Sequence, residues 1–212
     1  MDDLGTYLKT LITLFVIVDP VGAAPLFLSL TASHPPADRH RMAWRAAVSA
    51  TAVLLVAAIA GKAVLQLFGI GLASFRVAGG LLLLAMSLDM MNARPSRSRQ
   101  TPEESEEAEA REDIAVVPMA IPLLAGPGAI STVILLMQGK EASPGLWQLA
   151  SIIVLVGASA GLLLRLAVPM SRHLGRTGSN ILTRVMGLIL AAIAVEFMAA
   201  GTRELLPALA VR

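Results

Sequence analysis

The stretch that decides the fold of this chain is residues 15–27, which read FVIVDPVGAAPLF. An apolar run surrounds Pro20 and Pro25, with Gly22 between them and Asp19 just before them. Proline lacks a backbone N–H and collides with the preceding helical turn, so the pair predicts a broken helix. In lipid, carbonyls that lose their donors must find partners inside the protein or in a wet cavity. The break therefore indicates a binding site.

A second interruption of the same kind lies in residues 118–132, which read PMAIPLLAGPGAIST. Gly126, Pro127 and Gly128 interrupt an apolar run there, and both breaks fall near the centres of their runs. Broken segments in corresponding positions of two halves of a membrane protein are the best sequence indication of a transporter's substrate site. The alternative interpretation is a pair of proline kinks that only shape helix packing.

The composition is that of a membrane protein. The chain has 212 residues, of which 56% are hydrophobic and 15% charged, and its mean hydropathy is +0.73. A soluble domain of this length needs more charge to cover its surface. A bilayer core of roughly 30 Å takes about 20 apolar residues in a helix. Six stretches qualify, namely 5–31, 42–68, 70–91, 114–138, 146–168 and 180–201.

The chain is therefore predicted to be all-α, with six transmembrane helices that form two copies of a three-helix unit. Arg-Val-x-Gly strings begin at Arg76 and Arg184, 108 residues apart, and Pro20 and Pro127 are 107 residues apart. Because each copy has an odd number of spans, the copies form an inverted-topology repeat, with helices 1 and 4 broken at mid-membrane. The predicted organisation is one membrane domain with a first repeat in 1–91, a flexible charged cytoplasmic connector in 92–113 and a second repeat in 114–212.

The basic residues predict the orientation. With six spans, eleven arginines fall on one side of the membrane, and six lysines and arginines fall on the other. Since positive residues accumulate in cytoplasmic loops, the arginine-rich side is predicted to be cytoplasmic and both termini periplasmic. The basic residues flank the spans and form no folded basic face, so nucleic acid is not expected as a partner.

Residue types that are missing or misplaced exclude several kinds of chemistry. The chain has no cysteine, so disulfides and thiolate metal sites are excluded. His34, His40 and His173 fall in predicted loops, which leaves no buried metal site or Ser–His pair and argues against an intramembrane enzyme. We expect no cofactor and no metal centre, and the ions considered for coupling are H⁺ and Na⁺.

Asp19 is the acidic residue that the sequence singles out. A carboxylate near the bilayer centre costs about 2.5–3.5 kcal/mol on insertion scales, so it faces protein or water. Its simplest role is to cap the half-helix that begins at Pro20, because proline is favourable in the first helical position. Beside a cavity, the same carboxylate would also meet a substrate ammonium group or a proton.

At the two breaks the sequence resembles a known family. Asp19 to Pro25 resembles the D/N-P-x-G-x-x-P signature of the MarC/SnatA family, which belongs with the LysE-type transporters. Pro118 to Thr132 looks like that family's second signature, and the resemblance covers essentially all six spans. It implies a bacterial inner-membrane carrier for small neutral amino acids such as alanine and glycine. One departure is Ala23, where family members often have Asn.

We expect a small zwitterion to bind between the breaks. The half-helix after Pro127 offers unpaired N–H groups to a carboxylate, and Asp19 with the freed carbonyls would receive an ammonium group. Gly22 and Gly128 leave space for close approach of this ligand, and the small residues nearby leave space for only a short side chain. The predicted substrate-binding residues are Asp19, Pro20, Gly22, Ala23, Pro25, Gly126, Pro127, Gly128, Ala129, Ile130, Ser131 and Thr132. The alternatives left open are a passive channel for small solutes and a membrane protein with no transport role. A homo-oligomer is compatible with the sequence.

Overall fold

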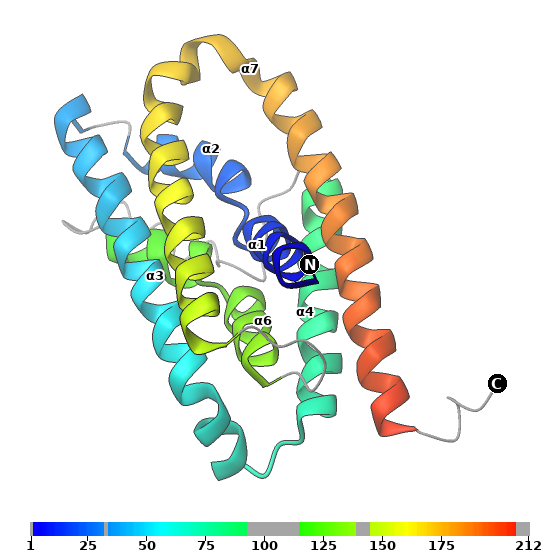
Figure 1. Ribbon diagram of the computed structural model, residues 1–212. Helices are drawn as coiled ribbons and strands as arrows, with labels where there is room; N and C mark the ends of the chain where they lie inside the picture. The colour runs from blue at the N-terminus through cyan, green and yellow to red at the C-terminus, as the bar shows by residue number, and fades with distance from the viewer. Residues whose placement is uncertain (1, 32–33, 93–114, 139–144, 207–212) are drawn as a thin grey trace.

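A computed structural model of the protein describes residues 2–31, 34–92, 115–138 and 145–206 (Figure 1). The elements are α1 (Asp2–Val18), α2 (Pro20–Leu30), α3 (Pro36–Leu67), α4 (Leu72–Met91), the π-helix η1 (Ala115–Leu124), α6 (Pro127–Gln138) and α7 (Leu146–Leu205). The described residues contain no strand, and the predicted all-α class is confirmed. The predicted connector, 92–113, lies outside the described residues except for Asn92.

Five helical stretches are long and apolar enough to cross a membrane, namely Leu4–Leu28, Pro36–Leu67, Leu72–Met91, Leu146–Pro169 and Thr183–Leu205. Their outer faces carry large apolar side chains such as Ile12, Val56 and Leu188, each at least 59% exposed, which suits contact with lipid. The predicted fourth span, 114–138, instead consists of η1 and the 12-residue α6. A helix of 12 residues is about 18 Å long, too short to cross alone. The count of six spans therefore stays a prediction.

α7 is helical along 60 residues, yet it folds back on itself (Figure 1). A straight helix of that length would measure about 90 Å, roughly three times the thickness of a bilayer core. The chain reverses between Pro169 and Thr183, and proline at the end of the first arm removes a helical donor. The two arms, Leu146–Pro169 and Thr183–Leu205, correspond to the predicted fifth and sixth spans.

α3 turns into α4 at the glycine-rich sequence 69–71, where the predicted spans 42–68 and 70–91 meet. Gly69 has a φ of +65°. The Ile70 N–H donates to the Leu65 carbonyl at 2.9 Å, and the Gly69 N–H donates to the Gln66 carbonyl at 3.1 Å. This pair of bonds is a Schellman motif, which satisfies the last carbonyls of α3 and needs a left-handed residue that glycine adopts without strain.

Glycines set the closest approaches between the helices. Gly80 of α4 lies against the second arm of α7, where an added Cβ would be 2.9 Å from the Ala194 carbonyl oxygen. Gly201 of that arm lies against α4, where an added Cβ would be 2.8 Å from the Ala73 carbonyl oxygen. Gly157 of the first arm lies likewise against α3. Lipid tails are as apolar as the helix surfaces, so the hydrophobic effect does not drive membrane helices together. Small residues let the helices approach closely, and the resulting van der Waals packing holds them together.

Candidate functional site

The first break is a single residue wide. Asp19 separates α1 from α2 and has a φ of +49°, the left-handed conformation that few residues other than Gly, Asn and Asp adopt. Its N–H donates to the Phe15 carbonyl at 3.0 Å and completes α1, while its carbonyl accepts the Ala23 N–H at 3.1 Å and starts α2. Asp19 is therefore both the end of one half-helix and the N-cap of the next, and its side chain is buried.

The carboxylate of Asp19 caps α2, as the sequence predicts. Its Oδ1 accepts the Gly22 N–H at 3.0 Å, and Pro20 occupies the first helical position, where its missing N–H is not needed. The carboxylate lies so close over Gly22 that a Cβ there would overlap it. In the Asp-Pro-x-Gly sequence, the aspartate thus caps α2 from a left-handed conformation, and the proline occupies the first helical position. The glycine leaves space for the capping carboxylate.

We expect Gly22→Ala to push the Asp19 carboxylate off its capping position and to destabilise the protein by about 1–2 kcal/mol, the usual loss with an N-cap. Thermal unfolding in detergent, followed by circular dichroism, measures the effect. Gly5→Ala in α1 is the matched control, because nothing lies within 4 Å of its added Cβ and alanine favours a helix. Equal melting temperatures for the two variants would contradict the described position of the carboxylate.

The far end of α2 is held by a residue that the sequence analysis did not single out. Arg39 of α3 donates from Nε to the Thr31 Oγ1 at 3.0 Å, and its Nη2 donates to the Leu28 carbonyl at 3.5 Å. A guanidinium at a helix C-terminus satisfies late carbonyls and complements the negative end of the helix dipole. The sequence held one indication of this role. Arg39 lies in the first turn of its own helix, after Pro36, where a positive charge is otherwise unfavourable.

The second break separates η1 from α6. The Ala125 N–H donates to the Ala120 carbonyl at 2.8 Å and closes the last wide turn of η1. The Gly126 carbonyl accepts the Ile130 N–H at 3.0 Å and starts α6. α6 begins with a proline, as α2 does, so two half-helices with proline in the first position stand at corresponding places.

Ser131 and Thr132 lie near the start of α6 and are buried. Their hydroxyls donate to the Gly128 carbonyl, at 3.0 and 2.8 Å respectively. Ser and Thr often bond back to their own helix in this way. In this conformation the two hydroxyl protons serve α6 itself, and the hydroxyl oxygens can still accept from another donor.

α4 covers the start of α6. A Cβ added at Gly128 would lie 2.7 Å from Cδ2 of Leu83 and 3.2 Å from the Met86 sulfur, and both of these α4 side chains are buried. Gly79 of α4 lies against Ser131, with an added Cβ 3.0 Å from its Oγ. The space that the sequence predicts beside Gly128 is therefore occupied by Leu83 and Met86.

The two broken segments pack against each other inside the protein, because α1 packs on α6 and α2 packs on η1. One buried cluster joins all four half-helices through residues such as Ile17, Phe27, Met119 and Val133. Of the predicted site residues, Asp19, Pro20, Ala23, Gly126, Gly128, Ala129, Ser131 and Thr132 are buried, Gly22 and Ile130 are partly buried, and Pro25 and Pro127 are exposed. Among the described residues, no group of three or more His, Asp or Glu side chains could hold a metal ion.

Comparison with known proteins finds relatives that match nearly the whole chain. The MarC family model, described as a MarC family integral membrane protein, matches residues 4–206. The chain is 37% identical to UPF0056 membrane protein YhcE of Escherichia coli, over 98% of this chain and 96% of that protein. It is 38% identical to UPF0056 membrane protein MJ1677 of Methanocaldococcus jannaschii, over 95% of this chain and 98% of that protein. No solved structure matches. As the sequence predicts, the chain belongs to the MarC family of integral membrane proteins.

Proposed function

We propose that this membrane protein transports small neutral amino acids, alanine- and glycine-like zwitterions, and binds them between the two helix breaks. The observation that carries the proposal is that two broken segments, distant in sequence, pack together in the buried interior. Membrane helices are interrupted where the freed backbone groups lie in protein or line a cavity. Paired interruptions are an arrangement that transporters use to bind substrate at the membrane midplane.

An inverted repeat of residues 1–91 and 114–212 is part of the proposal, and the packing supports it. A two-fold axis that exchanges the halves turns the contact of α1 with α6 into the contact of η1 with α2, and both contacts exist. The same axis turns the packing of α3 on η1 and α6 into the packing of α7 on α1 and α2. With the η1–α6 segment counted as one crossing, six crossings result, and the halves enter the membrane from opposite sides.

The substrate's two charges would meet complementary ends of the half-helices. The start of α6 presents the N–H groups of Gly128 and Ala129, with a partial positive charge of roughly half a unit, to the carboxylate. Pro20 and Pro25 cannot donate to the carbonyls of Val16 and Val21, four residues earlier, so these carbonyls and Asp19 receive the ammonium group. Small residues around the breaks leave room only for a short side chain.

Alternating access follows if α4 moves. Leu83 and Met86 cover Gly128, so a substrate reaches the start of α6 only when α4 withdraws. α4 would withdraw together with the second arm of α7, to which it is joined by glycine packing and by an ion pair of Arg76 with Glu204 at 3.4 Å. The proposal includes a bacterial inner membrane, which the family resemblance implies, and periplasmic termini, which the arginine distribution supports. Coupling to H⁺ or Na⁺ belongs to the same proposal.

Counterflow in proteoliposomes tests the function. Vesicles preloaded with unlabelled alanine should accumulate radiolabelled alanine transiently and with saturable kinetics, because a carrier exchanges bound substrate across the membrane. The assay is repeated with an imposed H⁺ or Na⁺ gradient and with leucine in place of alanine. Flux that rises linearly with alanine concentration would assign a passive channel, and absence of flux from folded protein would assign a role outside transport.

A further inference from the structure

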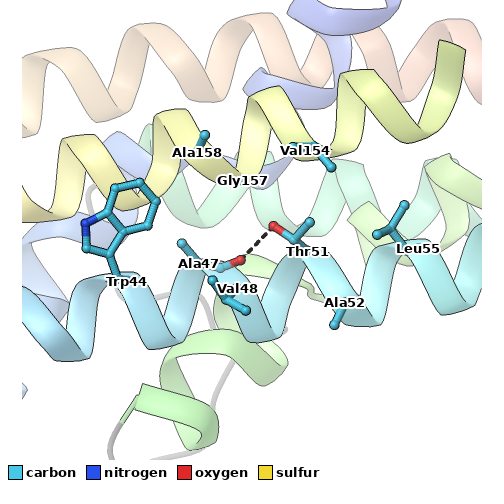
Figure 2. Close-up of a pocket in the computed structure, with 9 residues that line it drawn as sticks. All are labelled: Trp44, Ala47, Val48, Thr51, Ala52, Leu55, Val154, Gly157 and Ala158. Atoms are coloured by element: carbon cyan, nitrogen blue, oxygen red, sulfur yellow. Dashed lines mark hydrogen bonds between the residues drawn. The ribbon is translucent and has the colours of Figure 1, made fainter. Parts of the chain in front are cut away.

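An open groove runs along the outside of the protein between α3 and the first arm of α7 (Figure 2). Its volume is about 290 Å³, with Trp44 at one end and Leu55 at the other. Gly157 forms part of its wall and lets α7 approach Thr51. The groove lies on a face with exposed apolar side chains such as Val48, so it is separate from the buried breaks.

The groove is lined almost entirely by hydrocarbon. Thr51 supplies a hydroxyl, but this hydroxyl donates to the Ala47 carbonyl of its own helix at 2.7 Å (Figure 2). A ligand would therefore make apolar contacts here, and a polar group buried in the groove would have few hydrogen-bond partners. This chemistry fits an acyl chain and does not fit a zwitterion.

Two arginines lie on α3 and α7 beyond the Trp44 end of the groove. Arg41 lies three residues before Trp44 and so on the same face of α3. Arg165 of α7 lies one turn beyond Gly161, which packs against Trp44. Both arginines are exposed, and neither forms an ion pair with any described residue. Trp and Arg at one end of a membrane helix are typical of the bilayer interface, where guanidinium groups meet phosphates.

The dimensions favour one lipid chain. The eleven residue steps from Trp44 to Leu55 rise about 16 Å, roughly half of a 30 Å hydrocarbon core and so one leaflet. A helix about 10 Å across does not fit between α3 and α7, because Gly157 brings these two helices into contact at Thr51.

We propose that this groove binds an acyl chain of one anionic phospholipid, whose headgroup phosphate lies at Arg41 and Arg165. The chain runs from Trp44 toward the membrane centre and fills the space between α3 and α7. The proposal is independent of the transported substrate, because it uses none of the residues at the breaks.

Quenching of Trp44 fluorescence by brominated lipids tests the proposal. The chain has two tryptophans, so Trp147→Phe leaves Trp44 as the reporter. The protein is reconstituted in phosphatidylcholine with a small, fixed fraction of brominated phosphatidylglycerol or of brominated phosphatidylcholine. We expect the anionic lipid to quench at least threefold more per molecule. Trp44→Phe, with Trp147 as the reporter, should show no such preference.

Variants then separate the headgroup from the chain. Arg41→Gln with Arg165→Gln should remove the preference for the anionic lipid. Ala52→Leu and Ala158→Leu each fill the groove and should lower quenching by deeply brominated chains, whereas Val56→Leu, outside the groove, should not. Equal quenching by both lipids would overturn the proposal. The proposal would also be overturned if Trp44 were shielded from every brominated lipid and the particle had the mass of two copies. A second copy of the chain would then cover this face.

Discussion

Gly80→Val is expected to destabilise the protein by about 3 kcal/mol or more, at the upper end for overpacking an interface. The added Cβ alone would lie 2.6 Å from the Met198 Cγ, 2.9 Å from the Ala194 carbonyl oxygen and 3.0 Å from the Met198 backbone nitrogen. Two of these atoms belong to the backbone of α7, so relief requires the whole arm to move away from α4. Because close packing is what holds membrane helices together, the loss should extend along the interface to Gly187 and Gly201.

Thermal unfolding of the purified protein in detergent measures this loss, and size-exclusion chromatography reports the fraction that remains a single species. Ala78→Val is the matched control, because Ala78 lies on the exposed face of α4 and a substitution there changes stability by about 0.5 kcal/mol or less. Gly80→Ala should fall between the two. If both valine variants melt at the same temperature, the described approach of α4 to α7 is wrong.

The local features of the breaks could be predicted from the sequence because few residues decide them. A proline cannot donate a helical hydrogen bond wherever the rest of the chain lies, so Pro20 and Pro127 fix where the second half-helices begin. Asp19 caps the half-helix that follows it for the same local reason. The turn at Gly69 depends on one residue that adopts a positive φ without strain.

Features that depend on distant contacts could not be predicted. The sequence suggested free space at Gly128, because glycine has no side chain, but α4 brings Leu83 and Met86 into that space. Hydroxyls near a helix start suggested ligand contacts, yet Ser131 and Thr132 bond back to the Gly128 carbonyl. Gly126, Pro127 and Gly128 predicted a break within 114–138, but they did not predict that the half before it would be the π-helix η1.

Variants of Asp19 separate the shape of the first break from its charge. Asp19→Asn keeps a capping oxygen and tolerates the left-handed conformation, so its stability should be within about 0.5 kcal/mol of the unmodified protein. Asp19→Gly keeps the conformation and loses the cap. Asp19→Ala loses both and should be destabilised by roughly 2–3 kcal/mol. The expected order of melting temperatures is Asp and Asn above Gly, and Gly above Ala. Equal melting of the Ala and Asn variants would contradict a capped, left-handed Asp19.

Alanine uptake should separate the Asn variant from the unmodified protein even though both fold. A hydrogen bond to a charged acceptor contributes about 1–1.5 kcal/mol more than one to a neutral acceptor, so Asp19→Asn should raise the apparent KM for alanine about tenfold. Uptake is measured in proteoliposomes with equal amounts of incorporated protein. Glu196→Gln is the control for loss of a negative charge, because Glu196 is exposed on α7. An unchanged KM in a stable Asn variant would mean that the break needs the shape of Asp19 and not its charge, and that the ammonium group binds elsewhere.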